Sequence, residues 1–458
     1  MVKGAKGEDE SWAEREREEE EYVPLHVPEE FRSVAWEESK VKVREVWQRY
    51  LGQELILEPE FQRHYVWDPT RASRYIESLL LRLPTPAIFI AEEQDGLWAV
   101  IDGHQRLETV FRFLQPVLQG PTAAAGKTQT KYTVLTPLTL RALEVLPELN
   151  GKGVVALSIE DRSKLWDTEL SVIRLPKSVH SDMKYALFAR LNQGSMSLNS
   201  QELRNCLYRG PYNKLIASLG EDYRFLTLWK KNEPDKRMRH RELVLRVFAL
   251  LHRMDRYRRP FRSFLNDEME TNRNLDPVSA ERFRQEFAIA CTWVDRVFGQ
   301  EAFRLFRRGD TGNPPGRWGK PRNDLLFELE MVGFAQAGAL LEKTWSSLTD
   351  ADRKLFAMAV RRRLVDVMVL DRFVDAFSEG TTDPGKLRRR FELWTQALGK
   401  ATNEPDALLR DAKVLHQKLI QSNVCAICPN QVGPDDAAWA STEGAQRLVH
   451  RFCQTPSA

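Results

Sequence analysis

The sequence predicts an α+β domain over residues 34–210, a mainly α-helical domain over 211–420 and a small zinc-binding module over 421–458. Three observations predict this order. Short apolar runs mix with helical periods in the first region, strand-like runs almost vanish in the second, and three of the five cysteines fall in the last 34 residues. A length of 458 residues agrees with about three domains.

The composition is that of a soluble globular protein. With 42% hydrophobic and 29% charged residues, the chain differs from disordered, collagen-like and coiled-coil proteins. It has no run of about 18 apolar residues, so we expect no transmembrane helix and no membrane partner. The charged N-terminus is unlike a secretory signal, and five cysteines are too few for a disulfide framework. We therefore expect a cytoplasmic protein.

Charge is distributed unevenly along the chain. Residues 1–22 hold nine acidic and four basic residues, and we expect residues 1–33 to form a solvated, disordered tail. Basic clusters follow at residues 230–262 and 304–322. Such clusters suit a polyanionic partner, although a solvated surface is the commoner explanation of basic residues. Composition alone leaves both interpretations open.

The elements of the first domain follow from local periodicity. Four short apolar runs have the composition of strands and lie at residues 55–57, 87–91, 97–101 and 170–175. The second and third of these runs are separated only by a turn-like segment, so they are expected to be neighbouring strands. Helical spacing is found at residues 41–51, 71–83, 105–114, 181–191 and 200–207.

The middle region has helical periodicity almost throughout. Its apolar stripes include residues 243–251, 283–291, 356–367 and 408–419. A stretch rich in glycine and proline, residues 309–321, interrupts the helices. No fixed-period repeat is present, which favours a helical domain over a solenoid.

The most informative segment is WAVIDGHQRLETV, residues 98–110, which predicts a strand, a tight turn and a helix. The first amides of such a helix have no intrahelical acceptor and lie at the positive end of its dipole, so they can bind phosphate. Gly103 would let a phosphate approach the backbone closely, and Arg106 could add a bidentate contact to that phosphate. Asp102 could hold a water or a hydrated Mg²⁺, and Gln105 could orient a water. An ordinary capped helix with polar surface residues would explain the same pattern.

Two further segments carry candidate functional residues. The segment FQRHYVWD, residues 61–68, interleaves polar groups with aromatic rings, which suits both base stacking and core packing. The segment FARLNQG, residues 188–194, ends a helix. Its Asn192 suits either a C-cap or a functional role.

Taken in order, these segments resemble the N-terminal domain of GmrSD-type restriction proteins. The resemblance lies in FQRHYVWD, IESLLLRLPTPAIFI, VIDGHQRLETVFRFL and FARLNQGSMSLNSQELRN, and it continues through RGPYNKLI and RELVLRVFALLHR to about residue 265. It implies a ParB/sulfiredoxin-like fold. It also implies nucleotide binding or hydrolysis, coupled to the sensing of modified DNA in bacterial defence against phage.

The resemblance also implies roles for individual residues. The family signature Ile/Val-Asp-Gly-Gln-Gln-Arg falls on residues 101–106, where His104 replaces the first glutamine. Asp102, Gln105 and Arg106 would then be catalytic, with a nucleoside triphosphate and Mg²⁺ as ligands. The residues expected to bind the nucleotide are Gln62, Arg63, Gly103, His104, Arg106 and Asn192. In the helical domain, the residues expected to contact DNA phosphates are Lys230, Lys231, Arg237 and Arg239.

The C-terminal module has the spacing of a structural zinc site. Cys425 and Cys428 form one C-x-x-C pair, and His450 and Cys453 form an H-x-x-C pair. The same block resembles the zinc frame of HNH (ββα-metal) nucleases, which need a central Asp-His. This sequence has Trp439-Ala-Ser-Thr in that place, and it has no histidine between Cys428 and His450. We therefore expect a degenerate HNH module that keeps its zinc but does not cut DNA.

Two other functions stay open at this point. One is an active HNH nickase whose general base comes from elsewhere, such as His416. The other is a non-catalytic DNA-binding adaptor in which the strand-turn-helix holds DNA phosphate in place of a nucleotide. A second copy of the chain, or another protein of the same defence system, is left open as a partner.

Overall fold

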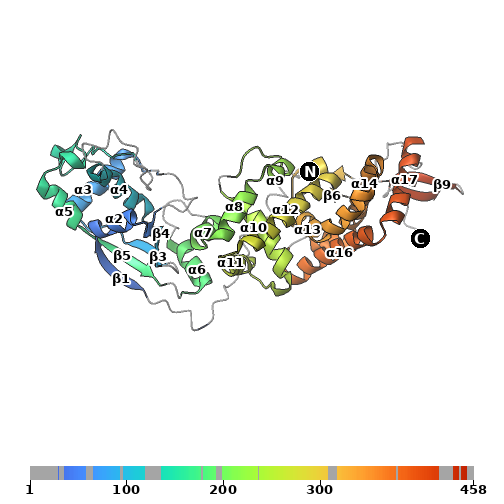
Figure 1. The fold of residues 1–458 in the computed structure, drawn as a ribbon, viewed down its shortest axis with the longest axis horizontal. Helices are drawn as coiled ribbons and strands as arrows, with labels where there is room; N and C mark the ends of the chain where they lie inside the picture. The colour runs from blue at the N-terminus through green and yellow to red at the C-terminus, as the bar shows by residue number, and fades with distance from the viewer. Residues whose placement is uncertain are drawn as a thin grey trace, which may run out of the picture. The chain divides into compact units, whose positions relative to one another are not determined.

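The computed structural model describes residues 29, 36–57, 65, 67–92, 96–118, 136–176, 179–191, 199–235, 237–307, 317–377, 380–421, 437–442 and 445–450. Apart from residue 29, the tail expected over residues 1–33 lies outside this set. The chain divides into two compact units between Leu207 and Tyr208. The first unit contains a small sheet with helices, and the second is mostly helical (Figure 1). The α+β class of the N-terminal region and the helical class of the remainder are therefore confirmed.

The first unit is built on a five-stranded mixed sheet in the order β1-β5-β3-β4-β2. The central pairing of β5 with β3 is parallel, and that of β3 with β4 is antiparallel, as expected for the neighbouring runs. The edge pairings are β1 with β5, antiparallel, and β4 with β2, parallel. The strands are β1 (Glu37–Lys42), β2 (Leu55–Ile56), β3 (Ile88–Glu92), β4 (Trp98–Asp102) and β5 (Glu169–Leu175).

Strand β1 is missing from the sequence-based prediction. Four of its six residues are exposed, and only Val41 is buried, so it has no apolar alternation to reveal it. It is held instead by its ladder to β5 at the edge of the sheet. Because β1 takes up Val41 and Lys42, the helix expected from residue 41 begins at Val43.

Helices of the first unit bury their apolar stripes in one shared core with the sheet. Phe111 of α4 lies at its centre, with ring centroids 5.2 Å from Trp47 and 4.4 Å from Tyr50 of α2. This packing holds α4 firmly at the end of β4. The helices are α2 (Val43–Leu51), α3 (Pro69–Leu80), α4 (His104–Leu118), α5 (Ile159–Asp167), α6 (Ser181–Leu191) and α7 (Ser200–Leu207).

The second unit packs long helices around buried aromatic residues. Gly333 of α13 lies so close to α16 that a Cβ atom there would come within 2.7 Å of the Trp394 ring, so glycine is required for this approach. The helices are α8 (Pro211–Gly220), α9 (Tyr223–Leu228), α10 (Arg239–Arg253), α11 (Phe261–Thr271), α12 (Pro277–Val297), α13 (Asp324–Ser347), α14 (Asp350–Met368), α15 (Asp371–Ala376), α16 (Pro384–Asn403) and α17 (Pro405–Gln421).

Two short hairpins interrupt or follow these helices. Strand β6 (Phe306–Arg307) lies just before the region expected to break the helices, residues 309–321, and pairs with β7 (Arg317–Trp318) inside it. Strands β8 (Ala437–Thr442) and β9 (Ala445–His450) pair near the C-terminus. Among the described helices, none is long and apolar enough to cross a membrane.

Candidate functional site

The expected strand-turn-helix is present where β4 ends at Asp102 and α4 begins at His104. The single residue between them, Gly103, has φ of +104°, a conformation that side chains other than glycine rarely adopt. A Cβ atom at this position would lie 3.0 Å from Cγ1 of Ile88. Backbone conformation and the contact with β3 therefore both require glycine here.

The start of α4 can accept an anion. The first helical hydrogen bond in this turn runs from the amide of Leu107 to the carbonyl of Gly103, at 2.9 Å. The amides of the three preceding helical residues thus have no acceptor within the helix, and the helix dipole places positive charge beside them. No acidic residue lies in the first turn of α4 to neutralise that charge.

The guanidinium group of Arg106 is engaged within the protein. Its Nη2 lies 2.5 Å from Oδ2 of Asp102, and its Nη1 donates to the carbonyls of Pro86 and Ala87 at 2.5 and 3.1 Å. Arg106 is only 9% exposed, whereas the Asp102 side chain is 42% exposed. Arg106 therefore joins the end of β4 to the residues entering β3. A phosphate contact from Arg106, which stays a prediction, would have to compete with these bonds.

Gln105 links the start of α4 to the aromatic segment before α3. Its Oε1 accepts a hydrogen bond from the amide of Trp67 at 3.3 Å. Nearby, the hydroxyl of Tyr65 is 2.8 Å from Oγ1 of Thr109, and the guanidinium of Arg112 lies 4.1 Å from the centre of the Tyr65 ring. Tyr65 and Trp67 are thus attached along α4, beside its first turns.

His104 points into the protein and is 8% exposed. Burial, followed by the positive charge of Arg112, lowers its pKa to about 4. Glu108 lies 3.4 Å from Nε2 of His104, but its other carboxylate oxygen is held by Arg112 at 2.6 and 2.8 Å. The carboxylate charge is thereby shared with Arg112, and burial dominates, so His104 is neutral at neutral pH.

The structure brings together the five motif residues from Asp102 to Arg106 at one turn. Three other expected nucleotide-binding residues, Gln62, Arg63 and Asn192, lie outside the described residues. Among the residues that support the turn, Tyr65 and Trp67 belong to the aromatic segment that the sequence singled out, whereas Glu108 and Arg112 were missed. The spacing of His104, Glu108 and Arg112 at intervals of four residues was the signal that could have identified part of this set.

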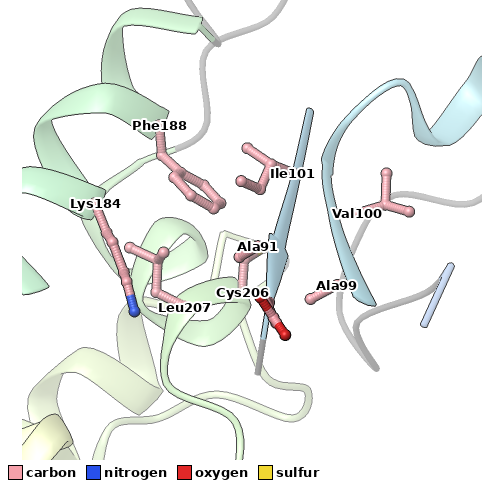
Figure 2. Close-up of a pocket in the computed structure, with 9 residues that line it drawn as sticks. Ala91, Ala99, Val100, Ile101, Lys184, Phe188, Cys206 and Leu207 are labelled. Carbon is pink, nitrogen blue, oxygen red and sulfur yellow. The ribbon is translucent and has the colours of Figure 1, made fainter. Parts of the chain in front are cut away.

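A small pocket lies elsewhere in the first unit, between strands β3 and β4 and helices α6 and α7. Figure 2 shows Phe188 of α6 pointing toward Ile101 of β4 across this space. Its described lining is mainly apolar, with Lys184 and Glu92 as the charged members, and includes none of the residues predicted from the sequence. Such a lining is better suited to packing than to binding phosphate.

In the second unit, the four expected DNA-binding residues lie at the connection between α9 and α10, and all are exposed. Lys230 and Lys231 follow the C-terminus of α9, and Arg237 and Arg239 lie at the start of α10. Arg239 differs from the lysines because its Nη2 is 2.7 Å from Oδ1 of Asp324. Its charge is thus partly neutralised.

The expected zinc ligands are almost entirely outside the described residues. This applies to Cys425, Cys428 and Cys453, while His450 ends β9, of which the backbone alone is described. Within the described part of the chain, no group of three or more His, Cys, Asp or Glu residues could hold a metal ion. Zinc binding by this module stays a prediction.

Comparison with known proteins finds a family match within the N-terminal part of the chain. Residues 43–209 match the family described as GmrSD restriction endonuclease, N-terminal domain. This range includes the four motif segments up to residue 205, whereas most of RGPYNKLI and all of RELVLRVFALLHR lie beyond it. The match supports the expected family for this part of the chain, and that family suggests a restriction-type protein of phage defence. No curated protein and no solved structure matches the chain.

Proposed function

Because residues 43–209 match the N-terminal domain of GmrSD restriction endonucleases, we propose that this protein couples DNA sensing to nucleoside triphosphate hydrolysis. The triphosphate binds with Mg²⁺ at the start of α4, and the second unit contacts DNA phosphates. The observation that supports the nucleotide site best is the turn at Gly103. A positive φ, first-turn amides without a helical acceptor and a first turn without acidic residues suit a phosphate group.

Each residue of the turn has a distinct role in this proposal. The amides of the first turn of α4 hold a phosphate oxygen, and Gly103 lets that oxygen approach the backbone. Bound Mg²⁺ would neutralise phosphate charge, and the carboxylate of Asp102, which is half-exposed, would hold one of its waters. Arg106 fixes the orientation of that carboxylate through its 2.5 Å contact. Gln105, fixed by the Trp67 amide, orients the attacking water.

A single substitution tests whether phosphate binds at this turn. Gln105→Glu keeps an oxygen to accept the Trp67 amide, and a carboxylate in the first helical turn is favourable to the helix. The new negative charge lies where the phosphate is expected. We expect triphosphate affinity, measured by calorimetry with Mg²⁺, to fall by about tenfold or more, which is about 1.4 kcal/mol.

Gln115→Glu is the matched control, because it places the same charge near the other end of α4. Its triphosphate affinity should equal that of the wild type. Equal losses in the two variants would argue against a site at the start of α4. Absence of triphosphate binding by the wild type would favour the adaptor function, in which this turn holds DNA phosphate.

For the C-terminal module we propose a closed structural zinc site without nuclease activity. The two ligand pairs, Cys425 with Cys428 and His450 with Cys453, support four-coordinate zinc with no open position for water. Elemental analysis should find about one zinc per chain, lost in the Cys425→Ser, Cys428→Ser double variant. Plasmid nicking by the wild type that is lost in this variant would instead support the nickase. Loss of nicking in His416→Ala would identify the base.

A further inference from the structure

Two basic segments that are far apart in the sequence lie side by side in the second unit. Nε of Arg322, just before α13, donates to the carbonyl of Leu228 at the end of α9, at 2.8 Å. One residue further on, the ring of Trp229 lies 5.1 Å from that of Phe303, centre to centre. The connection between α9 and α10 is therefore fixed against the region of the β6–β7 hairpin.

The charges on these two segments are mostly positive and exposed. In the described parts of residues 228–239 and 303–324, exposed acids are limited to Glu233 and Asp235. The exposed basic residues are Lys230, Lys231, Arg237, Arg239, Arg307, Arg317 and Lys320.

Two of these basic residues lie opposite each other in the hairpin. Arg307 of β6 and Arg317 of β7 are direct cross-strand partners, and both are exposed. Side chains that are directly opposite on one strand pair lie close together. One anionic group could therefore contact both guanidinium groups.

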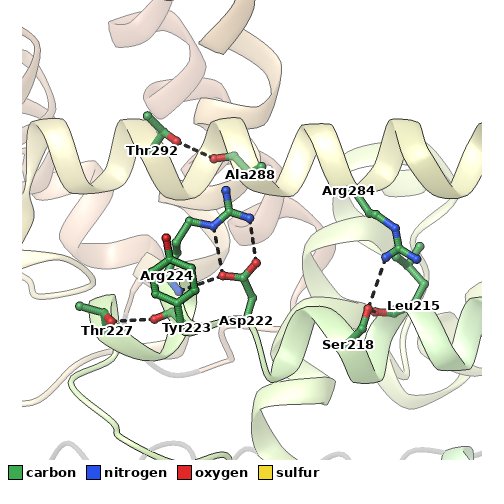
Figure 3. A network of polar contacts seen from close by, with 9 residues as sticks. All are labelled: Leu215, Ser218, Asp222, Tyr223, Arg224, Thr227, Arg284, Ala288 and Thr292. Atoms are coloured by element: carbon green, nitrogen blue, oxygen red, sulfur yellow. Dashed lines mark hydrogen bonds and ion pairs between the residues drawn. The ribbon is translucent and has the colours of Figure 1, made fainter.

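Neighbouring arginines of the same unit are neutralised and do not add to this surface. Arg224 of α9 forms two hydrogen bonds with the carboxylate of Asp222, at 2.8 and 3.1 Å (Figure 3). In the same view, Arg284 of α12 contacts the uncharged hydroxyl of Ser218. The charge of Arg284 is partly offset by Glu281, whose Oε2 lies 4.0 Å from its Nε. The face of α9 around Arg224 is therefore internally paired, and the excess charge begins only beyond the end of α9.

We propose that the α9–α10 connection and the β6–β7 hairpin form one cationic surface that holds the phosphate backbone of duplex DNA. This inference rests on the proposed contact of the second unit with DNA and extends it to the hairpin. Two separate segments held side by side can contact phosphates at more than one place on a duplex. Backbone contacts of this kind give salt-dependent affinity with little sequence preference.

The test is charge reversal in β7 and directly after it, in Arg317→Glu with Lys320→Glu, which we call the hairpin variant. Duplex DNA affinity should fall, and the slope of log affinity against log salt should decrease in magnitude by up to about 1.8, or about 0.9 for each phosphate that the variant no longer neutralises. Triphosphate affinity should not change. The matched control is Arg388→Glu with Arg389→Glu, two exposed arginines of α16, which should leave the slope unchanged.

Four outcomes would overturn the inference. In the first, the hairpin variant does not change the salt slope, whereas reversal of Lys230 and Lys231 reduces it. The protein would then bind DNA without contacts from the hairpin. Equal effects of the hairpin and α16 variants would show a general charge effect. Tighter binding to structured RNA than to duplex DNA would identify another ligand. Absence of DNA binding by the wild type would contradict the proposed function as well.

Discussion

The turn at the start of α4 and the cationic surface of the second unit use basic residues in opposite ways. At the turn, Arg106 and Arg112 are paired with carboxylates of the same helix region and face inward. On the cationic surface, Lys230, Lys231 and Arg317 are exposed. The comparison shows that a basic residue in a motif can serve the fold through internal ion pairs. In our proposal, phosphate binding at the turn is then left to backbone amides, and exposed basic clusters outside the motif provide the charge for a polyanion.

The largest expected effect comes from reversing the exposed charges. In the triple variant Lys230→Glu, Lys231→Glu, Arg237→Glu, duplex DNA affinity should fall by two orders of magnitude or more at low salt. The salt slope should decrease in magnitude by up to about 2.7, because three phosphates are no longer neutralised and each contributes about 0.9. Filter binding or fluorescence anisotropy across a salt series measures both quantities.

Arg239 tests whether internal pairing weakens the contribution of a basic residue to DNA binding. Because Asp324 already partly neutralises Arg239, the single variant Arg239→Ala should reduce DNA affinity less than Lys230→Ala does. Equal effects of these two variants would show that internal pairing does not decide which basic residues bind DNA. The distinction between the two regions would then fail.

Burial of His104 makes the free energy of unfolding of the protein depend on pH. Its pKa is about 4 in the folded protein and ordinarily 6.5, so between these values the unfolded chain binds the proton first. The stability contributed by neutral His104 is complete above pH 6.5 and is lost as the pH falls toward 4. This loss amounts to about 3 kcal/mol.

The variant His104→Gln isolates this effect, since glutamine is polar like histidine but does not titrate. Urea unfolding at pH 7 and pH 4.5 should show a smaller loss of stability in the variant than in the wild type. An identical loss in both proteins would mean that His104 is not held neutral by burial.

The smallest expected effect concerns Arg106. Replacing it by alanine removes three hydrogen bonds, one of them to a carboxylate, and should lower the free energy of unfolding by about 1–3 kcal/mol. The exposed Lys230→Ala should leave stability within about 0.5 kcal/mol of the wild type. Chemical denaturation compares the two. An Arg106→Ala variant as stable as Lys230→Ala would show that the internal bonds of Arg106 contribute little.

Much of the fold could be predicted from the sequence because apolar periodicity reports burial directly. The helices α6 and α7 have the expected bounds, and the neighbouring strands β3 and β4 are where their apolar runs indicated. Strand β1 could not be predicted, because its residues are mostly polar and the ladder to β5 determines its conformation. Its stability depends on a partner about 130 residues away in the sequence.

The candidate site was predictable only in part, for a related reason. The turn at Gly103 follows from local sequence, since a strand, a glycine and a helical period stand in succession. The hydrogen bonds of Arg106 to the carbonyls of Pro86 and Ala87 cannot be predicted from local sequence, because they depend on β3 and β4 lying side by side. Likewise, the hydrogen bond between Arg322 and Leu228 joins two basic clusters that the sequence shows only as separate.

The most direct test of the central claim is triphosphate turnover by the purified protein, with and without duplex DNA, at low and high salt. We expect Mg²⁺-dependent release of phosphate that changes when DNA is added at low salt. The effect of DNA should disappear at high salt, because salt ions displace the cationic surface from the DNA phosphates, while turnover without DNA persists. Absence of turnover of all four common triphosphates, in every condition, would contradict the claim that the start of α4 is a nucleotide site controlled by DNA.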